Sequence, residues 1–223
     1  MSLFITFEGP EGSGKSTQIK LLYTHLLAQN LPVVQTREPG GTAIGDQIRK
    51  VLLSPEHAEM LPVTEFLLFS ASRAQLVSQF IRPHLAAGRM VICDRYADSS
   101  LAYQGYAQGL DPEKLRQITG FATGGLTPDC TIYFDLDVTA GLQRKQHASV
   151  PLDRLDAKSI EFHERVRRGY LAMAAQEPVR WLVVNAEADV NTVQGKVRRH
   201  VEQLIAAQTT RAQPEGDCGE TDR

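Results

Sequence analysis

Short runs of consecutive apolar residues recur along the chain, and longer amphipathic stretches separate them. Such a run is typical of a strand whose two faces are both covered, as in a parallel sheet between layers of helices. The runs that predict strands are Leu3–Phe7, Val33–Thr36, Met90–Cys93, Thr131–Phe134 and Trp181–Val184.

The stretches between these runs have apolar residues at every third or fourth position, which predicts amphipathic helices. In Ser16–Gln29, for example, Ile19, Leu22 and Leu26 share one helical face. The alternation predicts an α/β fold: a doubly wound, five-stranded, mostly parallel sheet flanked by helices, with ligands beyond the carboxyl ends of the strands. The predicted helices are Ser16–Gln29, Ile44–Leu53, Thr64–Ala87, Pro112–Phe121, Thr139–His147, Ser159–Gln176 and Val190–Ala207.

Length and composition fit a single domain of this kind. The chain has 223 residues, of which 42% are hydrophobic and 22% are charged. We expect the folded domain to span residues 1–207. From residue 208 to 223 the apolar periodicity gives way to Thr, Gln, Pro, Glu, Gly and Asp, which predicts a disordered C-terminal tail.

Charge and cysteine usage exclude several classes of protein. The net charge of −2 provides no general attraction to nucleic acid or to membranes, so we expect neither as a partner. The sequence has no apolar run that approaches the length of a membrane span. Cys93, Cys130 and Cys218 do not have metal-ligand spacing, and a reduced, cytoplasmic protein is the simplest interpretation.

The segment from Gly9 to Ser16 reads GPEGSGKS, a complete GxxxxGK[ST] phosphate-binding loop between a predicted strand and a predicted helix. Its backbone N–H groups can converge on phosphate oxygens, and the following helix adds its positive N-terminal end. We expect Lys15 to reach the β- and γ-phosphates and the Ser16 hydroxyl to bind Mg²⁺. The loop therefore predicts a nucleoside triphosphate site formed by Gly9, Pro10, Glu11, Gly12, Ser13, Gly14, Lys15, Ser16 and Thr17.

Two further segments follow the next predicted strands and should lie at the same edge of the sheet. Arg37 begins the loop REPGGT, where it could meet an anion or be an ordinary surface residue of a turn. Asp94 ends a buried strand beside the phosphate-binding loop, a position that suits the hydration shell of a metal ion. Asp94 and the adjacent Arg95 could instead form a structural ion pair.

A third candidate lies within a predicted helix. Phe69 and Arg73 are four residues apart and therefore share a face. An aromatic ring and a guanidinium group side by side can hold a nucleobase by stacking and hydrogen bonding, although the same spacing is also common in helix packing.

Taken in order, these segments resemble the thymidylate kinase family of nucleoside-monophosphate kinases, which make dTDP from dTMP and ATP. The resemblance runs over roughly residues 3–205 and implies a P-loop kinase fold with a short lid, the use of ATP and Mg²⁺, and a homodimer. The segments that carry it are FEGPEGSGKS at Phe7–Ser16, REPGGT at Arg37–Thr42, FSASR at Phe69–Arg73, DRYADSSLAYQG at Asp94–Gly105, PDCTIYFDLDV at Pro128–Val138 and LDR at Leu152–Arg154.

The resemblance implies roles for the charged residues. Glu11 corresponds to the acid that contacts the deoxyribose 3′-hydroxyl and helps to arrange phosphates and metal. Arg95 corresponds to the arginine that holds the acceptor phosphate, and Arg37 and Arg49 correspond to further phosphate contacts.

It also implies how the nucleoside would be recognised. Phe69 corresponds to the aromatic residue that stacks on thymine, and Arg73 to the donor to thymine O4. Tyr103 corresponds to the tyrosine that crowds the sugar 2′ position. Ser99, Ser100 and Gln104 complete the expected acceptor pocket.

Family members differ in the source of the positive charge at the transferring phosphoryl group. Gly12 and Ser13 provide no basic residue in the phosphate-binding loop, so the resemblance implies that the lid, Gly141–Arg154, supplies it. Arg154 and then Arg144 match the pattern, whereas Lys145–Pro151 departs from it where such lids usually carry another arginine. The implied catalytic residues are Lys15, Glu11, Arg95, Arg154 and Arg144.

Other classes of P-loop protein would carry different sequence features. Another nucleotide or nucleoside kinase would share the phosphate-binding loop and the Asp94–Arg95 pair, but not the combination of REPGGT with Tyr103–Gly105. A GTPase should carry DxxG and NKxD motifs, and the sequence has neither. A partition or motor ATPase bound to DNA should have a basic surface, which the charge distribution does not suggest.

Overall fold

The computed structural model describes residues 2–147 and 153–212, and the strands of this part of the chain form one sheet in the order β2-β3-β1-β4-β5. All four pairs of neighbouring strands run parallel. The predicted α/β fold with a parallel sheet is therefore confirmed. The strands are β1 (Phe4–Glu8), β2 (Val33–Arg37), β3 (Met90–Asp94), β4 (Cys130–Asp135) and β5 (Trp181–Asn185).

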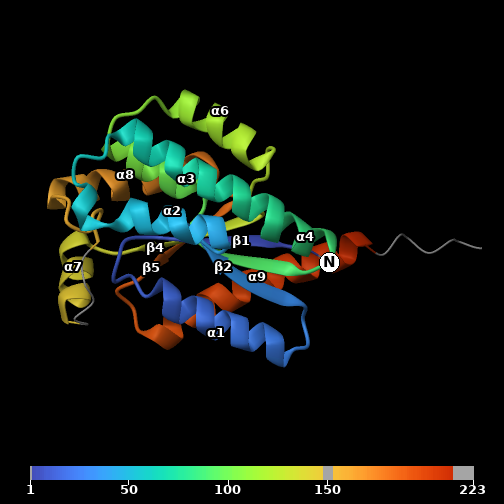
Figure 1. The fold of residues 1–223 in the computed structure, drawn as a ribbon. Helices are drawn as coiled ribbons and strands as arrows, with labels where there is room; N and C mark the ends of the chain where they lie inside the picture. The colour runs from blue at the N-terminus through green and yellow to red at the C-terminus, as the bar shows by residue number, and fades with distance from the viewer. Residues whose placement is uncertain (1, 148–152, 213–223) are drawn as a thin grey trace, which may run out of the picture.

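Helices α1 (Lys15–Ala28) and α9 (Val190–Ala212) pack against each other and cover one face of the sheet, the lower one in Figure 1. Leu22 and Val197, one from each helix, are completely buried against strand residues such as Phe7. This cluster anchors β1 and α1, the two elements that flank the phosphate-binding loop.

Other helices lie on the opposite face, above the sheet in Figure 1. Two buried clusters fill this side, one around Leu76 and Ile81 against β1 and β3, the other around Tyr133 and Tyr170. Helix α3 packs against both α2 and α6. The helices on this side are α2 (Ala43–Leu53), α3 (Pro62–Leu76), α4 (Arg82–Ala86), α6 (Pro112–Thr123) and α8 (Ile160–Gln176).

Two helical regions differ from the sequence prediction. The helix expected over Thr64–Ala87 contains a π-helical turn at Val77–Ile81. After β3, the chain forms the short helix α5 (Ala97–Ser100) and a longer π-helical segment, η3 (Leu101–Ala107), neither of which was predicted. A π-helical turn takes one residue more than an α-helical turn, so a search for a 3.6-residue period does not find it.

The ends of the predicted domain also differ in detail. Helix α9 continues to Ala212 and includes residues 208–212 of the expected tail. Residues 213–223 lie outside the described part, so the tail stays a prediction for them. Helix α7 (Val138–His147), which contains the first part of the expected lid, follows β4, and residues 148–152 of the expected lid are likewise outside the described residues. A short 3₁₀ turn, η1 (Pro55–His57), follows α2. None of the helices in the described ranges has the length and apolar character needed to span a membrane.

Candidate active site

A cleft of about 700 Å³ opens at the carboxyl ends of β1, β2 and β3. Most of the predicted site residues line it, although they come from segments far apart in the sequence. Those on its wall are Glu11, Gly12, Ser13, Gly14, Lys15, Ser16, Thr17, Arg37, Arg49, Phe69, Asp94, Arg95, Ser99, Ser100, Tyr103, Gln104 and Arg144. Gly9, Pro10, Arg73 and Arg154 are not part of the wall.

The phosphate-binding loop joins β1 to α1 in a conformation that needs glycine. Gly14 has a φ of 86° at the start of α1, in the left-handed region that glycine adopts without strain. A Cβ atom on Gly9 would lie 2.8 Å from the carbonyl oxygen of Phe134. Helix α1 has no acidic residue in its first turn, so no carboxylate there offsets the positive end that faces the cleft.

Lys15 is held by the loop itself. Its ammonium group donates to the carbonyl oxygens of Gly9 and Pro10, both at 2.9 Å, and the side chain is almost completely buried. Burial and the nearby Arg95 guanidinium lower the pKa of Lys15, while the Glu11 carboxylate opposes this change. A phosphate that enters the loop could take the place of these two carbonyl groups as the partner of the ammonium.

Three arginines face this loop. Arg95 Nη2 donates to Glu11 Oε1 at 2.6 Å. Arg49 Nη1 donates to the carbonyl oxygen of Pro39 at 2.9 Å, and Arg37 lies 3.5 Å from Asp46. Lys15 and then Arg95 lower the pKa of Glu11, although burial opposes this. The cleft thus concentrates positive charge in a protein whose net charge is −2.

Arg73 lies in a buried position from which it does not line the cleft. Its Nε donates to Glu38 Oε2 at 2.8 Å, and its Nη2 donates to the Tyr96 carbonyl at 3.2 Å and to Ser100 Oγ at 3.0 Å. Its Nη1 has no hydrogen-bond partner among the described residues. Phe69 does line the cleft. Of the two residues expected to hold a base together, Phe69 is therefore at the cleft surface and Arg73 is buried beneath it.

The structure places Arg154 elsewhere than the resemblance implies. It is buried, its Nη2 lies 2.5 Å from Glu65 Oε2, and its Nε donates to the Leu52 carbonyl at 3.0 Å. Glu65 Oε1 in turn accepts a hydrogen bond of 2.6 Å from Gln104, which lines the cleft. Glu65 was not a candidate from the sequence, because nothing local distinguishes it from the exposed acids of other helices.

Two basic residues of the lid helix do reach the cleft. Arg144 Nη1 donates to the carbonyl oxygen of Ala186 at 3.0 Å. Lys145 forms a buried ion pair with Asp156, and its Nζ lies 3.9 Å from Glu11 Oε2 in the phosphate-binding loop. Lys145 stands in the segment where the sequence departs from the family pattern, and it provides the lid charge nearest to Glu11 among these contacts.

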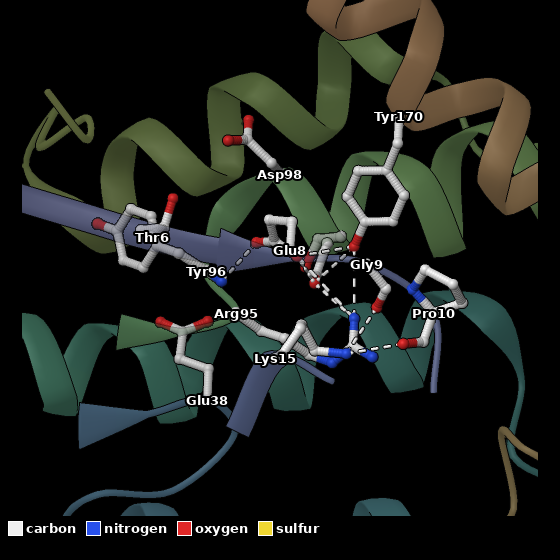
Figure 2. A network of polar contacts seen from close by, with 12 residues as sticks. Thr6, Glu8, Gly9, Pro10, Lys15, Glu38, Arg95, Tyr96, Asp98 and Tyr170 are labelled. Carbon is white, nitrogen blue, oxygen red and sulfur yellow. Dashed lines mark hydrogen bonds and ion pairs between the residues drawn. The ribbon is translucent and has the colours of Figure 1, made fainter. Parts of the chain in front are cut away.

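Sequence reasoning missed Glu8, the last residue of β1. It is completely buried, and its carboxylate accepts hydrogen bonds from the Tyr96 backbone N–H and from the hydroxyls of Ser99 and Tyr170. Figure 2 shows Tyr170 reaching from α8 toward Glu8, with Arg95 beside them. The available signal was an acid at the end of an otherwise apolar strand, directly before the phosphate-binding loop.

The proposed metal ligands, Ser16 and Asp94, both line the cleft. None of the described residues forms a group of three or more His, Cys, Asp or Glu side chains suited to a metal ion. The Ser16 hydroxyl and the Asp94 carboxylate together fit Mg²⁺, which binds through one or two protein oxygens together with substrate phosphates and water.

Comparisons with known proteins identify the family of this chain. The family model described as Thymidylate kinase matches residues 7–197. A thymidylate kinase from Roseiflexus castenholzii is 52% identical, with 93% of this chain and 96% of that protein covered. A thymidylate kinase from Deinococcus radiodurans is 51% identical, with coverages of 87% and 94%.

Solved structures include a similar fold. The crystal structure of thymidylate kinase from Ehrlichia chaffeensis matches with a TM-score of 0.74 and 35% identity, over 90% of this chain and 98% of that one. The sequence, the parallel sheet and the phosphate-binding cleft point the same way, and the chain belongs to the thymidylate kinase family.

Proposed function

We propose that the protein transfers the γ-phosphoryl group of ATP to dTMP and so produces dTDP and ADP. The observation that carries this proposal is the pairing of two anion-binding groups in one cleft. Lys15 lies in the phosphate-binding loop, and Arg95 faces the same loop, where its guanidinium donates a 2.6 Å hydrogen bond to Glu11. A donor and an acceptor phosphate can therefore meet in line between them.

The donor would occupy the phosphate-binding loop and the N-terminal end of α1. Lys15 would exchange its two carbonyl partners for phosphate oxygens. The Ser16 hydroxyl, with Asp94 nearby, would hold Mg²⁺, which neutralises charge on the phosphates when bound. No general base is required, because the acceptor phosphate is itself the nucleophile.

The acceptor would occupy the other part of the cleft. Arg95, with Arg37 and Arg49, would neutralise its phosphate. Phe69 would stack on thymine. Arg73 is buried next to the cleft lining, and its Nη1, which has no hydrogen-bond partner among the described residues, would donate to the edge of the base. The remaining pocket residues that we assign to dTMP are Ser99, Ser100, Tyr103 and Gln104.

The lid would bring positive charge to the transferring group. We assign this role to Lys145 and Arg144, which line the cleft. Arg154 would join them only in a conformation that releases it from Glu65, because its guanidinium is bound there in this structure.

A coupled assay of ADP release tests the function directly, with ATP against dTMP, dUMP, the ribonucleotide of thymine, dCMP, AMP and GMP. We expect the highest kcat/KM with dTMP. Discrimination against dUMP should be about 10–200-fold, because it depends on one methyl group. A higher kcat/KM with another monophosphate would indicate a different nucleotide kinase. ATP hydrolysis that DNA stimulates and no acceptor consumes would indicate a partition or motor ATPase.

We further propose a homodimer that forms through helices α2, α3 and α6. Apolar side chains on these neighbouring helices are exposed: Val63 is 55% exposed, Leu67 48% and Phe121 92%. Light scattering after size exclusion should find a dimer for the wild type and a monomer for Leu67→Glu. Val179→Glu changes an exposed apolar residue outside these helices and should stay dimeric.

The same proposal places the protein in the cytoplasm, where ATP and nucleoside monophosphates are available. The thiols of Cys93 and Cys130 are buried and form no disulfide in the described part of the chain, as a reducing compartment requires. Cell fractionation followed by the dTMP-dependent assay would test the location.

A further inference from the structure

Glu8 is a buried carboxylate in which one oxygen accepts a backbone hydrogen bond and the other accepts two hydroxyl hydrogen bonds. Oε1 accepts the backbone N–H of Tyr96 at 2.8 Å, just after the Asp94–Arg95 segment. Oε2 accepts both the Ser99 hydroxyl at 2.6 Å and the Tyr170 hydroxyl at 2.7 Å. The side chain has no exposed surface, so it cannot touch a substrate itself.

The same two hydroxyls lie under the guanidinium group of Arg95. Arg95 Nη1 donates to Ser99 Oγ at 3.4 Å and to Tyr170 Oη at 3.5 Å, and it lies 3.9 Å from Glu8 Oε2. The Tyr103 ring covers the group, with its centroid 5.4 Å from Arg95 Cζ. Arg95 itself has a φ of 67°, a left-handed conformation that is strained for a residue with a side chain. Surrounding contacts must therefore hold it in place.

A hydroxyl group has one proton and two lone pairs. When Ser99 and Tyr170 both donate to Glu8, their lone pairs remain for Arg95 Nη1. Burial raises the pKa of Glu8 to about 7, so above that pH the carboxylate is ionised, accepts both protons and fixes both directions together. A neutral amide at this position would offer an N–H group to one of the hydroxyls, whose proton would then be free to turn toward Arg95 or toward the other hydroxyl, 2.9 Å away.

We propose that Glu8 is a positioning residue for the acceptor phosphate, acting through the hydroxyls of Ser99 and Tyr170 to fix the guanidinium of Arg95. This inference rests on the proposed function, because it assumes that Arg95 binds the phosphate of dTMP. Glu8 connects the strand below the phosphate-binding loop to α5 and α8, as Figure 2 shows for Glu8, Arg95 and Tyr170. The donor site would be affected little, because Lys15 donates its hydrogen bonds to the carbonyl oxygens of Gly9 and Pro10 and not to Glu8.

Two variants test the inference by titration calorimetry at a pH above 7, where the Glu8 carboxylate is ionised, with dTMP and, separately, with ADP and Mg²⁺. Glu8→Gln keeps the shape and removes the charge. It should weaken dTMP binding about tenfold to a hundredfold, the range for hydrogen bonds to charged groups. Tyr170→Phe keeps the ring stacked on Tyr133, with centroids 4.8 Å apart, and removes one hydroxyl. It should weaken dTMP binding about threefold to tenfold, the range for one ordinary hydrogen bond.

Asp98 offers a matched control, because it is also a buried acid whose charge acts on Glu8, but it pairs with Arg180 at 2.7 Å and does not line the cleft. Asp98→Asn should change thermal stability and leave dTMP affinity within about twofold, since it removes no contact to Arg95. The affinity for ADP should be unchanged in all three variants. If folded Glu8→Gln and Tyr170→Phe bind dTMP as the wild type does, the inference is overturned and the proposed function stands. If the wild type binds ADP but no dTMP, the proposed function fails, and the inference with it.

Discussion

Arg154 and Glu65 form a buried ion pair in which Nη2 and Oε2 lie 2.5 Å apart. The backbone strengthens the connection, since Arg154 Nε donates to the Leu52 carbonyl and the Arg154 N–H donates to the Leu53 carbonyl. The pair therefore joins the segment after the lid helix to α2 and α3. Gln104, which lines the cleft, donates to the other oxygen of Glu65.

Arg154→Ala should lower the free energy of unfolding by about 3–5 kcal/mol, because it leaves the Glu65 carboxylate buried without its guanidinium partner. Urea denaturation measures this change. Arg116→Ala is a suitable control, since Arg116 makes an exposed contact of 4.0 Å with Glu113, and such pairs contribute about 0–1 kcal/mol. An unchanged unfolding curve together with a fall in kcat of about 10³–10⁵ would instead support the catalytic role implied by the resemblance.

Lys145→Ala should lower kcat steeply while changing the KM for dTMP little, because the lid charge acts on the transferring phosphoryl group. A catalytic cation of this kind contributes about 10³–10⁵ in kcat in phosphoryl-transfer enzymes. Single-turnover measurement at saturating ATP and dTMP isolates the chemical step.

Loss of Lys145 also leaves Asp156 without its ion-pair partner, so Asp156→Asn serves as the matched control. That variant removes the same pair and keeps the lysine. It should retain a kcat close to that of the wild type. Equal losses of kcat in both variants would mean that the ion pair matters through stability and that the lid charge comes from Arg144.

Lys15→Ala should nearly abolish turnover in a folded protein. A cation on the transferring phosphoryl group stabilises the transition state by roughly 2.7–4 kcal/mol, by analogy with a lost oxyanion donor. Circular dichroism checks the fold, and ADP release measures the rate. Retention of more than about a tenth of wild-type kcat, where the lost stabilisation predicts at least a hundredfold fall, would contradict the assignment of the phosphate-binding loop.

Arg73→Lys separates the two roles of Arg73. The lysine can still pair with the buried Glu38 carboxylate, 2.8 Å away in the wild type, but a point charge cannot replace the fork that leaves Nη1 available for a base. We expect kcat/KM for dTMP to fall about tenfold to a hundredfold, and the KM for ATP to be unchanged. If dTMP kinetics do not change and only the melting temperature falls, Arg73 is a packing residue.

The sequence predicted the strands well because each one is a continuous apolar run that must be covered on both faces. All five observed strands contain the predicted runs or begin within one residue of them, as in Leu3–Phe7 against Phe4–Glu8. The phosphate-binding loop was equally accessible, since its function depends on consecutive residues. The fold and the location of the cleft could therefore be predicted from local sequence patterns.

The buried acids of the site could not be found in the same way. Glu8 and Glu65 differ from exposed acids only through their partners, which are far away in the chain. Glu8 bonds with Ser99 and Tyr170, and Glu65 with Gln104 and Arg154. Such groups are stable in the interior because tertiary structure brings donors to them. The unexpected place of Arg154 has the same origin, since its sequence motif gives no information about Glu65.

Glu8 should make the stability of the protein depend on pH. Burial raises the pKa of Glu8 from its ordinary value of 4.5 to about 7, although the Arg95 charge opposes this change. Between pH 4.5 and about 7, Glu8 is therefore protonated in the folded state and ionised in the unfolded chain. Stability must fall as the pH rises through this window, because the folded state binds more protons there than the unfolded state.

Comparison of wild type with Glu8→Gln isolates this contribution, since the other titrating groups are common to both proteins. The difference in unfolding free energy, wild type minus variant, should decrease by up to about 3 kcal/mol between pH 4.5 and 7, at about 1.4 kcal/mol per unit of pKa change. Urea denaturation at half-unit steps of pH measures it. A difference that stays constant across the window would show that Glu8 is ionised throughout. A difference that increases with pH would show that Arg95 and the two hydroxyl donors stabilise the carboxylate by more than burial costs it.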